Sequence, residues 1–202
     1  MNSKLLIAAV TAAIGLAASP VSAESFDGPY FGVQGGWSRT EIADQASGNA
    51  PVDGELSRDS FALGGYAGYN WKIEDKWVIG TEAGFSGAFD DDVRGSADGS
   101  VLMIDPRYSF DLTARAGLVI SDQTLAYVRA GYTNTRLRTD VVIENGISRS
   151  SENLDGWLVG GGVERAITDD ISTRLEYRYS DLGDNGGRYD RHQSLVGISY
   201  NF

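Results

Sequence analysis

The sequence predicts an all-β protein: an eight-stranded antiparallel up-and-down transmembrane β-barrel with short periplasmic turns and four long extracellular loops. Three observations lead to this fold class. Apolar and polar residues alternate from about residue 30 to the C-terminus, which is typical of strands with one apolar face. The stretches between alternating segments are long and short in turn. Aromatic residues gather near both ends of the apolar face, as the two interfaces of a membrane favour.

The first 23 residues have the pattern of a secretory signal peptide. The positive charge of Lys4 precedes an apolar run over residues 5–18, and Pro20 and small residues follow it. This run is shorter than the roughly 20 residues that a membrane-spanning helix needs. We therefore expect residues 1–23 to be a cleaved signal peptide and residues 24–202 to form one outer-membrane β-barrel domain.

Composition excludes several functional classes. The chain has no cysteine, so disulfides, thiol catalysis and thiolate metal sites are ruled out. Its formal net charge is −11, and this acidity argues against nucleic-acid binding, which favours a basic face. The ordinary average hydropathy does not exclude a membrane barrel, because such barrels alternate a lipid face with a polar lumen face.

Four alternating segments occupy the first part of the predicted barrel domain. They cover residues 30–38, 60–71, 77–85 and 107–120. In the first, Phe31 and Trp37 share the apolar face, and in the second and third the opposite face is rich in glycine. The fourth is the most regular, because its apolar residues from Tyr108 to Ile120 occupy every second position. We interpret each segment as a strand with one lipid-facing side.

Four more segments complete the predicted barrel. They cover residues 125–134, 157–166, 172–180 and 192–202. The connections between all eight alternate in length. The long ones cover about residues 41–57, 89–104, 139–154 and 181–190, and the short ones cover residues 72–76, 121–123 and 168–170. Long loops at one end and short turns at the other are the layout of an outer-membrane barrel.

A soluble eight-stranded barrel of the lipocalin type is the main structural alternative. In that fold the apolar face points inward and the charged face points to solvent. Here the polar face is rich in small residues, which suit a narrow lumen already filled by side chains. Its glycines are at positions 32, 36, 64, 68, 80, 84, 117, 131, 160, 162 and 197. The two aromatic girdles are predicted as Phe31, Trp71, Trp77, Tyr200 and Phe202 at one rim, and Trp37, Phe61, Tyr108, Trp157 and Tyr179 at the other. Both patterns favour the membrane barrel.

Several motifs resemble a known family. They are "GPYFGVQGGW" after the signal, "LAYVRAGY", the segment 160–183 and the terminal "LVGISYNF". The chain resembles the small outer-membrane β-barrel family related to opacity-type surface antigens, and it is similar to the transmembrane domain of outer membrane protein A. Arg165 departs from the family, which often has an aromatic there. The resemblance implies a porin-like integral barrel of the bacterial outer membrane and no shared catalytic machinery.

The predicted lumen collects charged residues of both signs. They are Glu82, Arg107, Asp111, Arg115, Arg129, Glu164, Arg174, Glu176 and Arg178. Buried charges are tolerated when they are paired and hydrogen-bonded, so near balance in one tube predicts a salt-bridge network. Such a network either lines a selective ion path or plugs the lumen. The plug is favoured, since the interior of an eight-stranded barrel is just filled by side chains.

Three further patterns are candidates for chemistry. His192 and Ser194 share a predicted outward face, where a lipid-modifying hydrolase would place a base and a nucleophile, but such a base also needs an orienting acid. The acidic run 90–92 with Asp98 lacks the spacing of a known calcium loop, so we interpret it as a solvated loop tip. The glycines 160–162 lack the strand-to-helix context of a phosphate loop. No enzyme activity, metal or cofactor is predicted.

The function predicted from sequence is that of an integral outer-membrane protein with a structural and surface role. A small porin is the alternative, and a lipid-modifying hydrolase is a remote one. The expected partners are outer-membrane lipids, lipopolysaccharide and the barrel-assembly machinery. In the family that the chain resembles, a terminal strand ending in an aromatic residue is the assembly signal. Here its lipid-facing residues are Val196, Ile198, Tyr200 and Phe202.

Overall fold

The computed structural model describes residues 26–43, 56–74, 76–89, 93–97, 100–143, 146–183 and 188–202. The predicted signal peptide lies outside these residues. The strands are β1 (Gly28–Ala43), β2 (Leu56–Ile73), β3 (Trp77–Phe89), β4 (Val93–Ala97), β5 (Ser100–Ser121), β6 (Thr124–Ile143), β7 (Gly146–Ala166), β8 (Ile171–Asp181) and β9 (Arg188–Asn201). No helix in the described ranges is long and apolar enough to cross a membrane.

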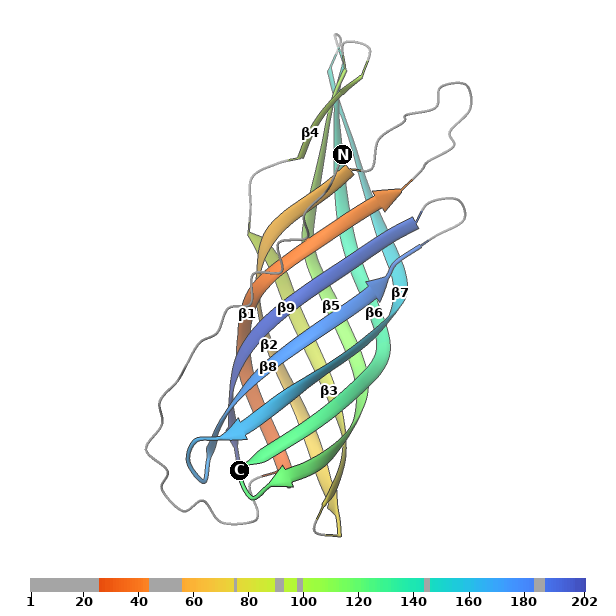
Figure 1. Ribbon diagram of the computed structural model, residues 1–202. Coiled ribbons are helices and arrows are strands. Elements are labelled where there is room, and N and C mark those ends of the chain that lie inside the picture. The colour runs from red at the N-terminus through yellow and green to blue at the C-terminus, as the bar shows by residue number, and fades with distance from the viewer. Residues whose placement is uncertain are drawn as a thin grey trace, which may run out of the picture.

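Eight of these strands close into a single antiparallel barrel (Figure 1). The hydrogen-bonded order is β3-β2-β1-β9-β8-β7-β6-β5-β4, and a further pairing of β3 with β5 completes the ring. β1 and β9 form the seam, which runs from the pair Tyr30 and Asn201 to the pair Ala43 and Arg188. Closure pairs the backbone groups that an open edge would leave unsatisfied in lipid. The predicted fold class is confirmed.

The short connections gather at one end of the barrel, here called the short-turn end. Two backbone hydrogen bonds fasten its turns, from the Val119 amide to the Lys76 carbonyl at 2.8 Å and from the Ala166 amide to the Gln123 carbonyl at 2.9 Å. The C-terminus lies at the same end (Figure 1). The opposite end, where the longer connections leave the strands, is called the long-loop end.

Two of the predicted long loops are wrong in part. Residues 93–97 form β4, and the predicted loops over 89–104 and 139–154 also contain the outer parts of β5, β6 and β7. β5 continues to pair with β6 as far as Val101 opposite Val142, and β-branched residues favour such extended pairing. At 20 to 22 residues, these strands are about twice as long as a tilted transmembrane strand needs to be. Their outer ends rise beyond the other strands in Figure 1.

The two faces of the barrel differ as the alternation predicts. Large apolar side chains such as Val33, Leu112 and Ile198 are exposed on the outside. The inside buries polar and charged side chains instead, which is the distribution of a barrel in lipid. All the predicted girdle residues have outward, exposed side chains except Tyr179, which is partly exposed. On this outer face the ring centroids of Phe31 and Tyr200 are 5.9 Å apart.

Glycine on the inner face permits the tight curvature of the wall. A Cβ atom added to Gly36 would lie 2.0 Å from the backbone oxygen of Ser194 and 2.9 Å from the Cα of Leu195. Gly65 faces outward, and a Cβ there would meet its nearest atom at 3.6 Å. Neighbouring strands therefore approach each other on the concave side more closely than a side chain at Gly36 would allow.

Candidate functional site

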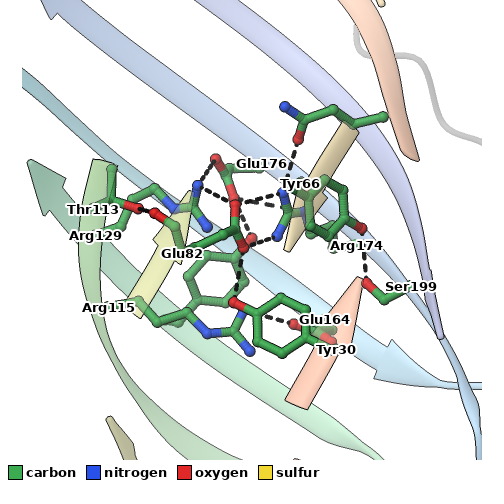
Figure 2. Close-up of polar contacts among 12 residues, drawn as sticks. Tyr30, Tyr66, Glu82, Thr113, Arg115, Arg129, Glu164, Arg174, Glu176 and Ser199 are labelled. Carbon is green, nitrogen blue, oxygen red and sulfur yellow. Dashed lines mark hydrogen bonds and ion pairs between the residues drawn. The ribbon is translucent and has the colours of Figure 1, made fainter. Parts of the chain in front are cut away.

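The candidate site is the lumen, and Glu82 of β3 lies at its centre. Its carboxylate accepts hydrogen bonds from Arg129 Nη1 at 2.9 Å and from Arg174 Nη1 at 2.6 Å. The hydroxyl of Tyr30 donates a third, at 2.9 Å. Figure 2 shows Glu82 between the two guanidinium groups, which come from β6 and β8 on either side of β7. One buried carboxylate thus joins β1, β3, β6 and β8.

A second carboxylate, that of Glu176 on β8, extends this network. It pairs with Arg178 and, at 3.4 Å, with Arg129. The hydroxyl of Tyr127 also donates to it. Because Arg129 contacts both Glu82 and Glu176, the two carboxylates share a cation. This sharing reduces the repulsion that two buried negative charges would otherwise exert on each other.

Glu164 of β7 forms a third ionic contact nearer the short-turn end. Arg115 Nη1 donates to its carboxylate at 2.9 Å, and Ser172 Oγ donates at 2.7 Å. Arg115 Nε donates to Asn70 Oδ1 at 2.8 Å. The Arg115 guanidinium carbon lies 4.7 Å from the ring centroid of Tyr30, so the aromatic face supplies a further favourable contact for the buried cation.

Of the four buried carboxylates in the described lumen, Asp111 of β5 lies nearest the long-loop end. Thr133 Oγ1 donates to it at 2.6 Å, and Arg178 Nη1 lies 3.4 Å away. Gln34 then connects two arginines, because its Oε1 accepts from Arg174 at 2.8 Å and from Arg178 at 3.0 Å. Polar contacts therefore run without interruption from Glu82 to Asp111.

Eight of the nine charged residues predicted for the lumen have buried side chains that join this network. The ninth, Arg107, falls at a register shift of β5 between Pro106 and Tyr108, and its side chain lies outside the described residues.

The network predicted from sequence contained only charged residues, and it left out several further partners in the lumen. They are Tyr30, Gln34, Tyr66, Asn70, Tyr127 and Arg191, all of them buried. The guanidinium carbon of Arg174 lies 3.4 Å from the ring centroid of Tyr66, whose hydroxyl is 2.7 Å from Ser199 Oγ. Alternation does assign Tyr66 and Tyr127 to the polar face of their strands, but it does not reveal their contacts with the charged residues.

An apolar cluster closes the lumen at the short-turn end. Phe26, Val78, Leu125, Tyr127 and Ala166 pack together there, and Leu125 is fully buried. Asp27, the neighbour of Phe26, accepts a hydrogen bond from the Lys72 amide at 2.9 Å. This contact fastens the chain before β1 to the end of β2 and keeps Phe26 in place.

At the other end the lumen widens into a small cavity of about 30 Å³. Ser38, Ser60, Ser109, Thr135 and Arg191 are among its lining residues. Deeper, where the lining includes Gln34, Arg178 and Gln193, the remaining space has no room for a water molecule. The lumen described here therefore has three layers: an apolar stopper, an ionic network and an outer polar cavity.

His192 and Ser194 do face outward, as predicted from parity. His192 Nδ1 is hydrogen-bonded to the hydroxyl of Tyr177 at 2.7 Å, and the ring of Tyr179 lies 5.2 Å from the His192 ring. The carboxylate of Asp190 accepts a bond of 2.9 Å from Tyr179. The sequence alone indicates no acidic residue on this outer face. Asp190 is an acidic residue there, two positions before His192 on β9.

Neither the predicted acidic loop tip nor the glycine run forms part of a described site. The acidic run 90–92 and Asp98 lie outside the described residues. Glycines 160–162 lie within β7, and a Cβ on Gly160 would be 2.8 Å from the Tyr177 carbonyl oxygen. Within the described ranges, no group of three or more histidine, aspartate or glutamate side chains is arranged to hold a metal ion.

The terminal strand carries the predicted assembly residues on its lipid face. Val196, Ile198 and Tyr200 are exposed, and Phe202 is 71% exposed. The amide of Phe202 donates to the Pro29 carbonyl at 3.1 Å, and its ring centroid is 5.7 Å from that of Phe31. The last residue is thus held to the first strand across the seam.

Comparison with known proteins agrees with this architecture. Residues 8–202 match the family model described as "Outer membrane protein beta-barrel domain". The chain is 30% identical to the 25 kDa outer-membrane immunogenic protein of Brucella ovis, over 89% of this chain and 78% of that protein. It is 29% identical to outer membrane protein A of Klebsiella pneumoniae, over 86% of this chain and 50% of that protein.

Solved structures show the same fold. Ail, the attachment invasion locus protein of Yersinia pestis, superposes with a TM-score of 0.57 at 15% identity, covering 87% of this chain and 99% of that one. Neisserial surface protein A superposes with a TM-score of 0.52 at 18% identity, covering 87% and 100%. Together with the family match, these comparisons show that the chain belongs to the outer membrane protein β-barrel domain family and is an integral protein of the bacterial outer membrane.

Proposed function

We propose that this barrel is a closed structural element of the outer membrane that displays its long-loop end at the cell surface, and that it is neither a pore nor an enzyme. The filled lumen is the observation that carries this proposal. The network around Glu82 occupies the centre, and the space beside Gln34 and Arg178 has no room for water. The apolar stopper closes the short-turn end, which faces the periplasm in this topology.

The small-porin alternative requires a continuous aqueous path. The apolar stopper and the ionic network would have to rearrange together to open one, and the network contains ion pairs whose side chains are almost fully buried. Separating such pairs without water to replace the contacts is costly. The relatives named as immunogenic proteins of Brucella support a surface role for the loops of this chain.

Planar-bilayer recording with the purified full chain tests the closed lumen. Inserted protein is expected to give no stepwise conductance above the leak of the bare bilayer, because ions find no aqueous path through the central layer. A known porin purified in the same detergent serves as the positive control. Reproducible steps of one size that scale with salt concentration would favour the porin instead.

The non-enzymatic part of the proposal rests on the surroundings of His192. Its Nδ1 is bonded to Tyr177, and Asp190 contacts Tyr179, so this group resembles a hydrogen-bonded aromatic rim at headgroup level. Mass spectrometry of lipid A from cells with the wild-type protein and with Ser194→Ala is expected to give identical acylation. A shift in acyl-chain mass that depends on Ser194 would establish a hydrolase.

The proposal also names partners. Outer-membrane lipids surround the apolar face, and lipopolysaccharide is the lipid that the long-loop end would meet in the outer leaflet. The barrel-assembly machinery is the proposed reader of the terminal strand, supported by the exposed alternation from Val196 to Phe202.

A further inference from the structure

Arg191 is the one buried arginine of the described lumen that lacks an ion pair. Its side chain extends from β9 into the outer cavity, and the residue is only 8% exposed. The four other buried arginines, at positions 115, 129, 174 and 178, each lie within 4.0 Å of a carboxylate. Among the described residues, no carboxylate comes this close to Arg191.

The buried charges of the described lumen therefore do not balance. Five arginines, including Arg191, face four carboxylates, those of Glu82, Asp111, Glu164 and Glu176. The excess positive charge is located at Arg191, since the other four arginines are paired. A buried charge without a counter-charge is strongly unfavourable, so this side chain needs a partner.

The contacts that Arg191 does make are weak. Its Nη1 donates to Thr135 Oγ1, and its Nη2 donates to Ser109 Oγ and Thr133 Oγ1, all at 3.3 Å. These are long bonds to neutral hydroxyls. The Nε of Arg191 is buried and has no hydrogen-bond partner in the described part of the chain. The Thr133 hydroxyl lies between the Arg191 guanidinium and Asp111. It accepts the hydrogen bond from Arg191 and donates its own to the Asp111 carboxylate at 2.6 Å.

The cavity beside Arg191 offers a place for the missing charge. It measures about 30 Å³, and Ser38, Ser60, Thr135 and Gln193 are among the residues that line it. Hydroxyl and amide groups can turn their N–H or O–H toward an anion. The volume corresponds to about one or two water-sized groups, so it suits a single-atom anion better than sulfate or phosphate.

We propose that Arg191 and the hydroxyls around it form a binding site for a small inorganic anion of the halide class. The anion supplies the negative charge that the described lumen lacks, and it sits above the ionic network on the side of the long-loop end. This inference goes beyond the structural role and does not depend on whether the lumen conducts.

Bromide serves as the probe, with the full chain refolded in detergent micelles. Protein labelled with ¹⁵N in its arginines is equilibrated in sodium gluconate, whose anion is too large for the cavity. Bromide then replaces gluconate at constant ionic strength. The Nε–Hε resonance of Arg191 is expected to shift and to saturate, while that of the exposed Arg136 follows no saturable curve. Sodium sulfate in place of bromide is expected to leave the Arg191 resonance unmoved.

Crystals soaked in bromide give an independent readout. An anomalous peak is expected in the cavity beside Arg191, and Arg191→Met is expected to abolish it. Arg136→Met is the matched control, because Arg136 lies near the same end on the outer face and donates to Tyr108 at 3.1 Å; this variant should keep the peak.

Several results would overturn the site. An Arg191 resonance indifferent to bromide would mean that water or another part of the chain fills the cavity. A peak in soaked crystals without saturation in solution would mean binding at crystal concentration only. An equal response to sulfate would contradict the halide-sized site. The wild-type titration decides the matter even if Arg191→Met fails to fold.

Discussion

At the scale of single residues, Glu82 is the side chain on which the lumen depends most. It contacts Arg129, Arg174 and Tyr30, all buried. Replacing it with Gln leaves two buried cations short of a counter-charge, so we expect the free energy of unfolding to fall by about 3–5 kcal/mol. Urea unfolding of the refolded protein in lipid vesicles, followed by tryptophan fluorescence, measures this loss.

Glu41→Gln is the matched control for that change. Glu41 pairs with Arg39 at 3.2 Å, but both side chains are more than 40% exposed. Solvent screens such a pair, so its loss should cost less than about 1 kcal/mol. Equal effects of the two substitutions would show that the buried network does not stabilise the barrel as described.

Gly36 gives a second residue-scale prediction. Gly36→Ala would bring a Cβ to 2.0 Å from the Ser194 backbone oxygen, so β1 and β9 would have to separate at the seam. We expect this variant to refold poorly, whereas Gly65→Ala on the outer face should refold like the wild type. The fraction of protein with the faster mobility of a folded barrel in unheated gel electrophoresis measures the difference. Normal refolding of Gly36→Ala would contradict the tight wall.

Residue identity explains which parts of the lumen could be foreseen. Eight of the charged residues that strict alternation assigns to the lumen have buried side chains, and each lies inside a long, regular strand. Arg191 was missed because the predicted last strand began at His192, whereas β9 begins at Arg188. Tyr30, Tyr66 and Tyr127 do not stand out as network residues in the sequence, because tyrosine suits both a membrane rim and a lumen where its hydroxyl finds a partner.

At the scale of elements, the seam between β1 and β9 determines how the chain can end. Phe202 donates one backbone hydrogen bond to Pro29 and packs its ring against Phe31 and Tyr200. These contacts lie at the edge of the barrel, and the pairs from Tyr30 to Ala43 remain without them. The structural contribution of Phe202 is therefore small compared with that of the whole strand.

Deleting Phe202 should accordingly impair assembly in cells more than stability in the test tube. We expect the truncated protein to refold in detergent with nearly the wild-type urea midpoint, while its level in isolated outer membranes falls severalfold. Quantitative immunoblotting of membrane fractions measures the level. Val33→Ala, on the lipid face of β1, is the control, because it removes apolar surface without touching the terminal residue. Normal membrane levels of the truncated protein would refute an assembly signal.

The strand segments that sequence reasoning misjudged are mainly the outer ends of β5, β6 and β7, past the length that a membrane-spanning strand needs. Outside the bilayer both strand faces meet water, so the alternation that identifies a transmembrane strand disappears. Segments such as "RTDVVI" in β6 and "GISRSS" in β7 then have no apolar face to mark them. Only their backbone pairing, which runs as far as Ile143 opposite Gly146, identifies them as strands.

At the scale of the whole molecule, charge and polarity are distributed in layers. An apolar belt faces lipid, charged groups fill the interior, and apolar side chains return at the short-turn end of the lumen. The charged interior joins strands far apart in sequence, as with Arg174 and Glu82. The ion pair between Arg174 and Glu82 spans the lumen, because β8 and β3 lie on opposite sides of the barrel, and such a contact opposes separation of the two walls.

A closed barrel is expected to strengthen the membrane that contains it without adding permeability. Cells that lack the protein should therefore become more sensitive to sodium dodecyl sulfate and should take up more of a hydrophobic dye. Wild-type protein expressed from a plasmid should restore both properties. Glu82→Gln should restore them less well if it lowers the amount of folded barrel, and immunoblotting separates that effect from a direct one. Unchanged detergent sensitivity and dye uptake in the deletion strain would refute a role in membrane integrity. The closed lumen is tested separately, by the conductance measurement.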